Sequence, residues 1–100
     1  MPRFNTEVPH SLGQEQATER LKDFLEKVTR VYKDQVSDLR GDWADNVLDF
    51  GFTSYGFKIS GVLTVEEDKA RIEGKLPMAA AMFRGKIESS IQGELEKALK

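Results

Sequence analysis

The stretch SLGQEQATERLKDFLEKVTRVYKDQVSDL, from Ser11 to Leu39, decides the predicted fold. Its apolar residues recur at steps of three and four, and charged residues fill most of the positions between them. This spacing is typical of an amphipathic α-helix with one apolar stripe. The stripe consists of Leu12, Ala17, Leu21, Phe24, Leu25, Val28, Tyr32, Val36 and Leu39. We therefore predict one long helix over residues 11–39, and we expect the rest of the chain to cover its stripe.

Both ends of this helix carry typical signals. Ser11 and Gln14 match the capping box Ser-x-x-Gln, and Arg40 followed by Gly41 is typical of a helix C-terminus. At about 1.5 Å per residue the helix would be about 43 Å long. A sphere equivalent to a domain of this size is only about 34 Å across. We therefore expect the helix to overhang, bend or fray before Leu39, around residues 34–38.

The remaining segments predict a small antiparallel sheet and a second helix. Residues 3–8 alternate apolar and polar side chains, as a half-buried strand does, and Pro9 ends this strand. After a connection over residues 42–46, three more alternating segments with short turns between them predict a meander. These segments are 47–54, 57–66 and 70–76. A second helix is expected over residues 78–100.

The predicted fold class is therefore α+β, with the element order β-α-β-β-β-α. We expect a twisted, mostly antiparallel sheet of about four strands, with the long N-terminal helix and the C-terminal helix on one face. Polar residues at alternate strand positions indicate that the other face is solvated. A single domain over residues 1–100 follows, because a chain of 100 residues supports one core.

A two-residue turn at Glu67 and Asp68 predicts the register of the last hairpin, because inward residues must face inward residues. The predicted pairs are Val65 with Ala70, Leu63 with Ile72, Gly61 with Gly74, and Ile59 with Leu76. The two adjacent glycines would leave a depression in the inner face. We expect helix side chains to fill it, namely Leu21, Phe24, Leu25 and Val28. A two-residue turn at residues 55–56 would add Phe50 to the row beside Gly61, whereas a four-residue turn would break the row.

Composition excludes several classes of function. The chain has 15 basic and 17 acidic residues, and the two signs are interspersed, so we expect no nucleic-acid partner. No apolar run approaches the roughly 20 residues that span a bilayer, and the N-terminus has no apolar signal-peptide core. We therefore expect a cytoplasmic protein without a membrane span. The absence of cysteine excludes thiolate catalysis, disulfides and cysteine metal sites.

Motifs for catalysis are sparse. The chain has no nucleophile elbow, no phosphate-binding loop and no dinucleotide-binding fingerprint, and it contains a single histidine. Asp42, Asp45, Asn46 and Asp49 offer oxygen ligands, but their spacing misses the calcium-loop pattern, and we interpret them as a solvated acidic loop. We expect no cofactor and no bound metal.

His10 is the one weak candidate for a catalytic residue. It precedes the N-terminus of the long helix, where the helix dipole favours the neutral imidazole. One interpretation is a general base or a ligand contact at the mouth of the core. The other is a histidine that packs at the strand–helix corner and bonds to the backbone. The second is favoured because the sequence assigns no carboxylate or nucleophile beside His10.

Five apolar or aromatic residues are candidates for contacts with a ligand or partner. Met78, Met82 and Phe83 would line an apolar pocket between the second helix and the sheet, or fill the core there. Trp43 and Tyr55, near the two ends of the 47–54 strand, would anchor a partner or cap the core. Core packing is the favoured interpretation for all five.

Three segments have a distinctive pattern when they are taken together: PHSLGQEQA over residues 9–17, YGFKISGVLTV over 55–65, and LPMAAAMFRGKIE over 76–88. They resemble the small bacterial family of polyhydroxyalkanoic acid system proteins, and the resemblance covers essentially the whole chain. It implies a genomic association with polyhydroxyalkanoate granule metabolism rather than a particular activity, and it implies no catalytic residue. A sheet wrapped on a long helix is also similar to a reduced helix-grip domain, a fold that often binds hydrophobic ligands.

Three hypotheses for the function follow. The favoured one is a non-enzymatic accessory or binding module, with polyhydroxyalkanoate granule components or a hydrophobic acyl ligand as its partner. The alternative is a small enzyme of the cyclase or isomerase type that uses His10 beside an apolar cavity. The third is a self-associating structural protein, a dimer or other homo-oligomer in which a second copy covers exposed sheet edges.

Overall fold

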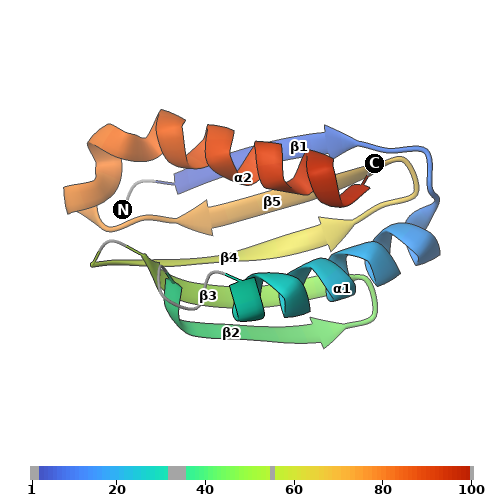
Figure 1. The fold of residues 1–100 in the computed structure, drawn as a ribbon. Coiled ribbons are helices and arrows are strands. Elements are labelled where there is room, and N and C mark those ends of the chain that lie inside the picture. The colour runs from blue at the N-terminus through green and yellow to red at the C-terminus, as the bar shows by residue number, and fades with distance from the viewer. Residues whose placement is uncertain (1–2, 32–35, 55, 100) are drawn as a thin grey trace.

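The structure is a computed structural model that describes residues 3–31, 36–54 and 56–99. It consists of one antiparallel sheet with two helices on one face (Figure 1), which confirms the predicted α+β class. The strands lie in the order β1-β5-β4-β3-β2, so the sheet has five strands rather than about four. The elements are β1 (Arg3–Pro9), α1 (Gln14–Val31), β2 (Val36–Ala44), β3 (Val47–Ser54), β4 (Phe57–Val65), β5 (Lys69–Lys75), the 3₁₀ helix η1 (Met78–Phe83) and α2 (Arg84–Leu99).

The additional strand comes from the end of the predicted long helix. α1 ends at Val31, and residues 36–44 form β2 at the edge of the sheet, so the prediction of helix up to Leu39 is wrong. The long axis of the whole fold is 37 Å, which is shorter than the helix that was predicted. Pairing with β2 also satisfies the backbone groups along one edge of β3. Gly41 is therefore a strand residue opposite Phe50 and not a helix cap.

The start of α1 also differs from the prediction. The helix begins at Gln14, after Gly13 with a φ of 83°, so Ser11 does not cap it. The backbone N–H of Ala17 donates to the carbonyl of Gly13 at 3.0 Å, and the N–H of Gln14 donates to Oε2 of Glu67 at 3.2 Å. The carboxylate that stabilises the helix N-terminus thus comes from the β4–β5 turn, far away in the sequence.

The predicted registers are confirmed. β4 and β5 pair Val65 with Ala70, Leu63 with Ile72, and Gly61 with Gly74. The predicted pair of Ile59 and Leu76 lies beyond the end of β5 at Lys75. β3 and β4 place Phe50 opposite Gly61, as the shorter of the two predicted turns requires.

A row of glycine and phenylalanine crosses all five strands at this level. Its members, from β1 to β2, are Phe4, Gly74, Gly61, Phe50 and Gly41. A methyl group on Gly74 would overlap the ring of Phe4, and one on Gly61 would overlap the backbone oxygen of Glu73 and lie 3.0 Å from Cζ of Phe50. The rings of neighbouring strands therefore cover these two glycines, and the prediction that α1 fills the depression is wrong. A side chain of α1 does cover the third glycine, because a methyl on Gly41 would lie 2.6 Å from Cδ2 of Leu25.

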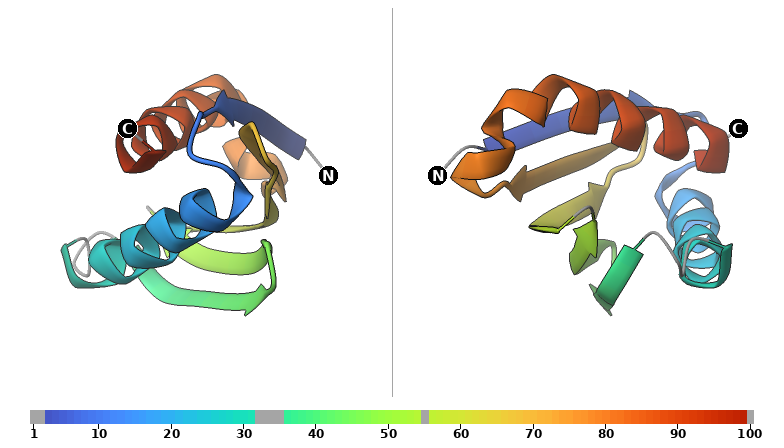
Figure 2. Two further views of the ribbon diagram at one scale, coloured as in Figure 1. Left: turned by 90° about the vertical axis from the view of Figure 1, so that its right-hand side faces the viewer. Right: turned by 60° about the vertical axis from the view of Figure 1, so that its left-hand side comes forward.

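The two helices form one layer on the sheet (Figure 2), and within residues 3–31, 36–54 and 56–99 no helix lies on the other face. α2 packs over β1, α1 packs over β2 and β4, and the two helices contact each other. Among the described residues, no helix is both long and apolar enough to cross a membrane. The core between the layers contains Phe4, Val8, Ala17, Leu21, Leu48, Phe50, Ile59, Leu63, Val65, Ala70, Ile72, Leu76, Ala80, Leu95 and Leu99.

The second helix begins with a 3₁₀ segment that the prediction did not contain. Residues 78–83 form η1, and the α-helical part starts only at Arg84. A 3₁₀ helix has about three residues per turn, so its side chains leave the stripe that an α-helix would have. Met82 and Phe83, expected on the buried stripe, are 83% and 45% exposed.

Candidate functional site

An apolar groove of about 290 Å³ lies between α1 and α2 over the middle of the sheet. Residues from both helices form its walls, and residues of β2, β3, β4 and β5 form its floor. The walls are Leu21, Phe24, Leu25 and Val28 of α1 and Ser90, Ile91, Glu94 and Leu95 of α2; the floor is Leu39, Leu48, Phe50, Phe52, Leu63 and Ile72. The volume is at the lower end of the range of roughly 300–1,000 Å³ that is typical of ligand sites.

The spacing of apolar residues on each helix explains the groove. On α1 its residues stand at positions i, i+3, i+4 and i+7, which form one face of a helix. Leu21 of α1 and Leu95 of α2 are buried at the bottom, whereas Phe24, Leu25 and Ile91 are only half-buried. The upper walls therefore present apolar surface to solvent, and this is the feature by which most small-molecule sites are recognised.

Two polar residues interrupt the apolar lining, and both belong to α2. Ser90 and Glu94 are four residues apart, so they are neighbours on one helix face. The Glu94 side chain is 39% exposed, and its Oε1 lies 3.8 Å from Nζ of Lys97. A serine hydroxyl can donate or accept a hydrogen bond, whereas a carboxylate only accepts and repels a second carboxylate. This pair therefore suits a ligand that carries a hydroxyl group and no negative charge.

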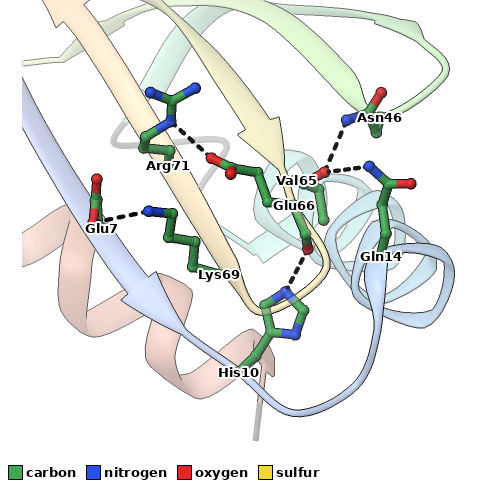
Figure 3. A network of polar contacts seen from close by, with 8 residues as sticks. All are labelled: Glu7, His10, Gln14, Asn46, Val65, Glu66, Lys69 and Arg71. Carbon is green, nitrogen blue, oxygen red and sulfur yellow. Dashed lines mark hydrogen bonds and ion pairs between the residues drawn. The ribbon is translucent and has the colours of Figure 1, made fainter.

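His10 has backbone partners at both ring nitrogens. Nε2 lies 3.0 Å from the carbonyl oxygen of Glu66 (Figure 3), and Nδ1 accepts from the N–H of Leu12 at 3.2 Å. These two bonds are satisfied together by the neutral imidazole with its proton on Nε2. The backbone N–H of His10 also donates to the carbonyl of Asp68 at 2.9 Å. His10 thus ties the β1–α1 corner to the β4–β5 turn, and it does not line the groove.

Further polar contacts join this end of the sheet (Figure 3). The Val65 carbonyl accepts from Nδ2 of Asn46 at 2.8 Å and from Nε2 of Gln14 at 3.1 Å. Ion pairs join Arg71 to Glu66 at 2.9 Å and Lys69 to Glu7 at 3.7 Å. Hydrogen bonds and ion pairs therefore hold the acidic turn between β4 and β5 against the adjacent elements.

The acidic residues around the β2–β3 turn are arranged around an arginine. Arg40 Nη1 lies 3.3 Å from a carboxylate oxygen of Asp49 and 3.8 Å from one of Asp42. Asn46 uses its side-chain amide on the Val65 carbonyl. Within residues 3–31, 36–54 and 56–99, no group of three or more histidine or acidic side chains is placed to hold a metal ion.

The four aromatic and methionine candidates that the structure describes do not come together at one site. Met78, Met82 and Phe83 lie on η1 and are exposed, so they do not line the groove. Trp43 stands on β2 opposite Leu48 and packs, partly buried, against the core, with Nζ of Lys22 at 5.8 Å from the centre of its ring. Tyr55 lies outside the described residues.

Sequence reasoning did not identify the groove, although it identified part of its lining. The α1 stripe was assigned to the core, and Ser90 and Glu94 were not singled out. One signal could have indicated it: the two helices have more apolar surface than the sheet can bury. Two amphipathic helices share one face of the sheet, and glycines occupy three positions of its inner face.

Comparison with known proteins places the chain in a family and in a fold. Residues 5–99 match the family described as "Putative polyhydroxyalkanoic acid system protein". No curated protein matches the sequence. The crystal structure of DynU16, a protein of the dynemicin biosynthetic locus, is similar with a TM-score of 0.68 and 12% identity over 97% of this chain. TTHA0849 from Thermus thermophilus is similar with a TM-score of 0.57 and 14% identity over 98% of this chain and 92% of its own.

The chain spans about half the length of DynU16, of which 46% is covered. At such low identities, both likenesses are to the fold.

Proposed function

The chain belongs to the polyhydroxyalkanoic acid system protein family, and from this membership we propose that it is a non-enzymatic binding module for an uncharged hydroxyacyl compound. The acyl chain would lie in the groove between α1 and α2. The observation that carries the proposal is the open apolar lining of this groove, in which Ser90 and Glu94 are the only polar residues within the described part of the chain.

The alkyl part of such a ligand matches the walls of the groove. Phe24, Leu25 and Ile91 are half-buried, so a bound chain would remove part of their remaining apolar surface from water. Each methylene group that becomes buried contributes about 0.8 kcal/mol, before the loss of ligand motion is subtracted. A groove of about 290 Å³ therefore favours a single chain of moderate length over a large ring system.

Ser90 and Glu94 of α2 determine which polar group of a ligand the groove accepts. A hydroxyl group can donate to the Glu94 carboxylate and exchange a hydrogen bond with Ser90. A free carboxylate beside Glu94 would be repelled, because two like charges in a partly desolvated groove disfavour each other. An ester of a hydroxy acid, or the hydroxyl-bearing end of a polyester chain, has a free hydroxyl group without this charge, and polyhydroxyalkanoic acids are polyesters of hydroxy acids.

A binding role is favoured over catalysis by the chemistry around the groove. Among the described residues, its lining contains no histidine and a single carboxylate. His10, the candidate base, uses both ring nitrogens on backbone groups. General acid–base catalysis would need such a group within reach of the ligand.

Calorimetric titration of the protein with the methyl ester of a medium-chain hydroxy acid tests the proposal. The two neighbouring serines of α2 provide a matched pair of variants, since both are exposed and only Ser90 lines the groove. Ser90→Phe should fill the groove and lower the affinity at least about tenfold, because the bulky ring takes the place of the chain. Ser89→Phe should leave the affinity unchanged.

The free acid and a further variant test the polar part of the site. We expect the free acid to bind more weakly than the ester, and Glu94→Gln to reduce this difference. No heat of binding with any chain length, or equal loss of affinity in both serine variants, would exclude the groove as the site.

A further inference from the structure

The segment η1 presents three apolar side chains to solvent. Met78 is 79% exposed, Met82 is 83% exposed and Phe83 is 45% exposed. Single apolar residues are common on protein surfaces, but three within one short helix form a local apolar surface that is unusual. Figure 1 shows this orange segment at the end of the molecule where the described chain begins, away from the C-terminus.

Basic residues stand at the same end of the sheet as η1. Lys75 is the last residue of β5, shortly before η1, and its strand partner is Arg3 at the start of β1. Lys58 follows Phe57, whose ring centre lies 6.2 Å from that of Phe83. All three basic residues are exposed.

The first turn of α2 adds positive charge directly after η1. It contains Arg84 and Lys86 and no acidic residue. Glu88 offsets Arg84, with which it pairs at 2.9 Å, and Glu73 is two residues before Lys75. Positive charge still predominates at this end.

The opposite end of the sheet carries acidic turns, whose charge Lys69 and Arg71 partly offset. The turn between β4 and β5 contains Glu66, Glu67 and Asp68, and the turn between β2 and β3 contains Asp45. The chain as a whole has a net charge of −2. The positive end is therefore a local feature.

We propose that this end of the molecule docks on an anionic lipid surface. The η1 end is defined as Met78, Met82 and Phe83 with the basic residues Arg3, Lys58, Lys75 and Lys86. The apolar side chains enter the boundary between headgroups and acyl chains, and the basic side chains contact the headgroup phosphates. Apolar side chains beside basic ones are the combination by which proteins lie on such surfaces. This surface is separate from the groove, and neither depends on the other.

Co-sedimentation of the full chain with lipid vesicles tests the proposal. We expect binding to vesicles that contain phosphatidylglycerol, weak or no binding to vesicles of phosphatidylcholine alone, and release at high salt, because screening removes the electrostatic part. Particles of bare polyhydroxyalkanoate polyester form a third arm that distinguishes a lipid surface from a polymer surface.

Two matched pairs of variants locate the surface. Met78→Ser with Met82→Ser should lower the affinity for anionic vesicles at least about tenfold, whereas Val62→Ser, an exposed apolar residue of β4, should not change it. Lys86→Glu should lower the affinity several-fold, whereas Lys97→Glu near the other end of the same helix should have little effect. Circular dichroism checks that each variant folds.

Three outcomes would overturn the proposal. They are absence of binding to anionic vesicles, equal binding to both lipid compositions, and binding that the methionine variants leave unchanged. Sedimentation with bare polyester particles but not with vesicles would also overturn it. None of these results bears on the titration of the groove, so the two proposals fail separately.

Discussion

At the scale of single residues, close packing rather than backbone freedom explains why Gly74 has no side chain. A methyl group there would overlap the ring of Phe4 and lie 2.6 Å from the backbone oxygen of Ser60. A ring can rotate, but a carbonyl within a paired strand cannot move without breaking the ladder. The register that sets these two glycines side by side follows from side-chain parity. Their cover by rings of the neighbouring strands depends on where β1 joins the sheet.

Replacement of Gly74 tests this packing. Gly74→Ala should lower the free energy of unfolding by roughly 1–3 kcal/mol through overpacking. Gly93→Ala is the matched control, since Gly93 lies within α2 with nothing within 4 Å of an added methyl. It should raise stability by about 0.5–1 kcal/mol, because alanine favours a helix over glycine. Urea denaturation measures both values, and a Gly74→Ala variant as stable as the wild type would contradict the account.

His10 is a second residue whose side chain contributes to the stability of the fold. His10→Ala removes the hydrogen bonds to the Glu66 carbonyl and the Leu12 N–H, and stability should fall by about 1–3 kcal/mol. Affinity for the hydroxyacyl ester should be retained, since His10 does not line the groove. Denaturation and calorimetric titration of the same sample check the two expectations. Unchanged stability together with lost binding would assign His10 to the ligand site instead.

At the scale of elements, the end of α1 shows why part of the fold could be predicted and part could not. The strands 47–54, 57–66 and 70–76 alternate over their whole length, and their turns allow only inward residues to face each other. Val36 and Leu39 also continue the helical spacing of α1, so local pattern alone favours helix. Residues 36–44 form a strand because they pair with the free edge of β3. This is a tertiary interaction, and a short window of sequence gives no information about it.

The contact between α1 and β2 can be measured by a double-mutant cycle. Gly41→Ala should destabilise the wild type by about 1 kcal/mol, because the new methyl would lie 2.6 Å from Cδ2 of Leu25. With Leu25→Ala in place, the same change should be neutral or favourable. The coupling energy should lie in the range of about 0.5–3 kcal/mol that is found for residues in contact. Equal effects of Gly41→Ala in both backgrounds would show that α1 does not pack on β2 in this way.

At the scale of the whole molecule, composition and periodicity predict the α+β class, both helices on one face and the open opposite face. They do not predict the groove, because a half-covered helix stripe and a fully covered one have the same spacing. Phe24 and Leu25 were assigned to the filling of a glycine depression. Phe4 and Phe50 perform that function at Gly74 and Gly61, so much of the α1 stripe stays available at the groove.

Nuclear magnetic resonance of isotope-labelled methyl groups tests whether this groove binds an acyl chain. The protein is titrated with the methyl ester of a medium-chain hydroxy acid. We predict saturable shifts for the methyl groups of Leu21, Leu25, Ile91 and Leu95, which line the groove, and none for Val62 on β4, which does not line it. Shifts confined to methyl groups outside the groove, or no shifts at saturating ester, would contradict the account.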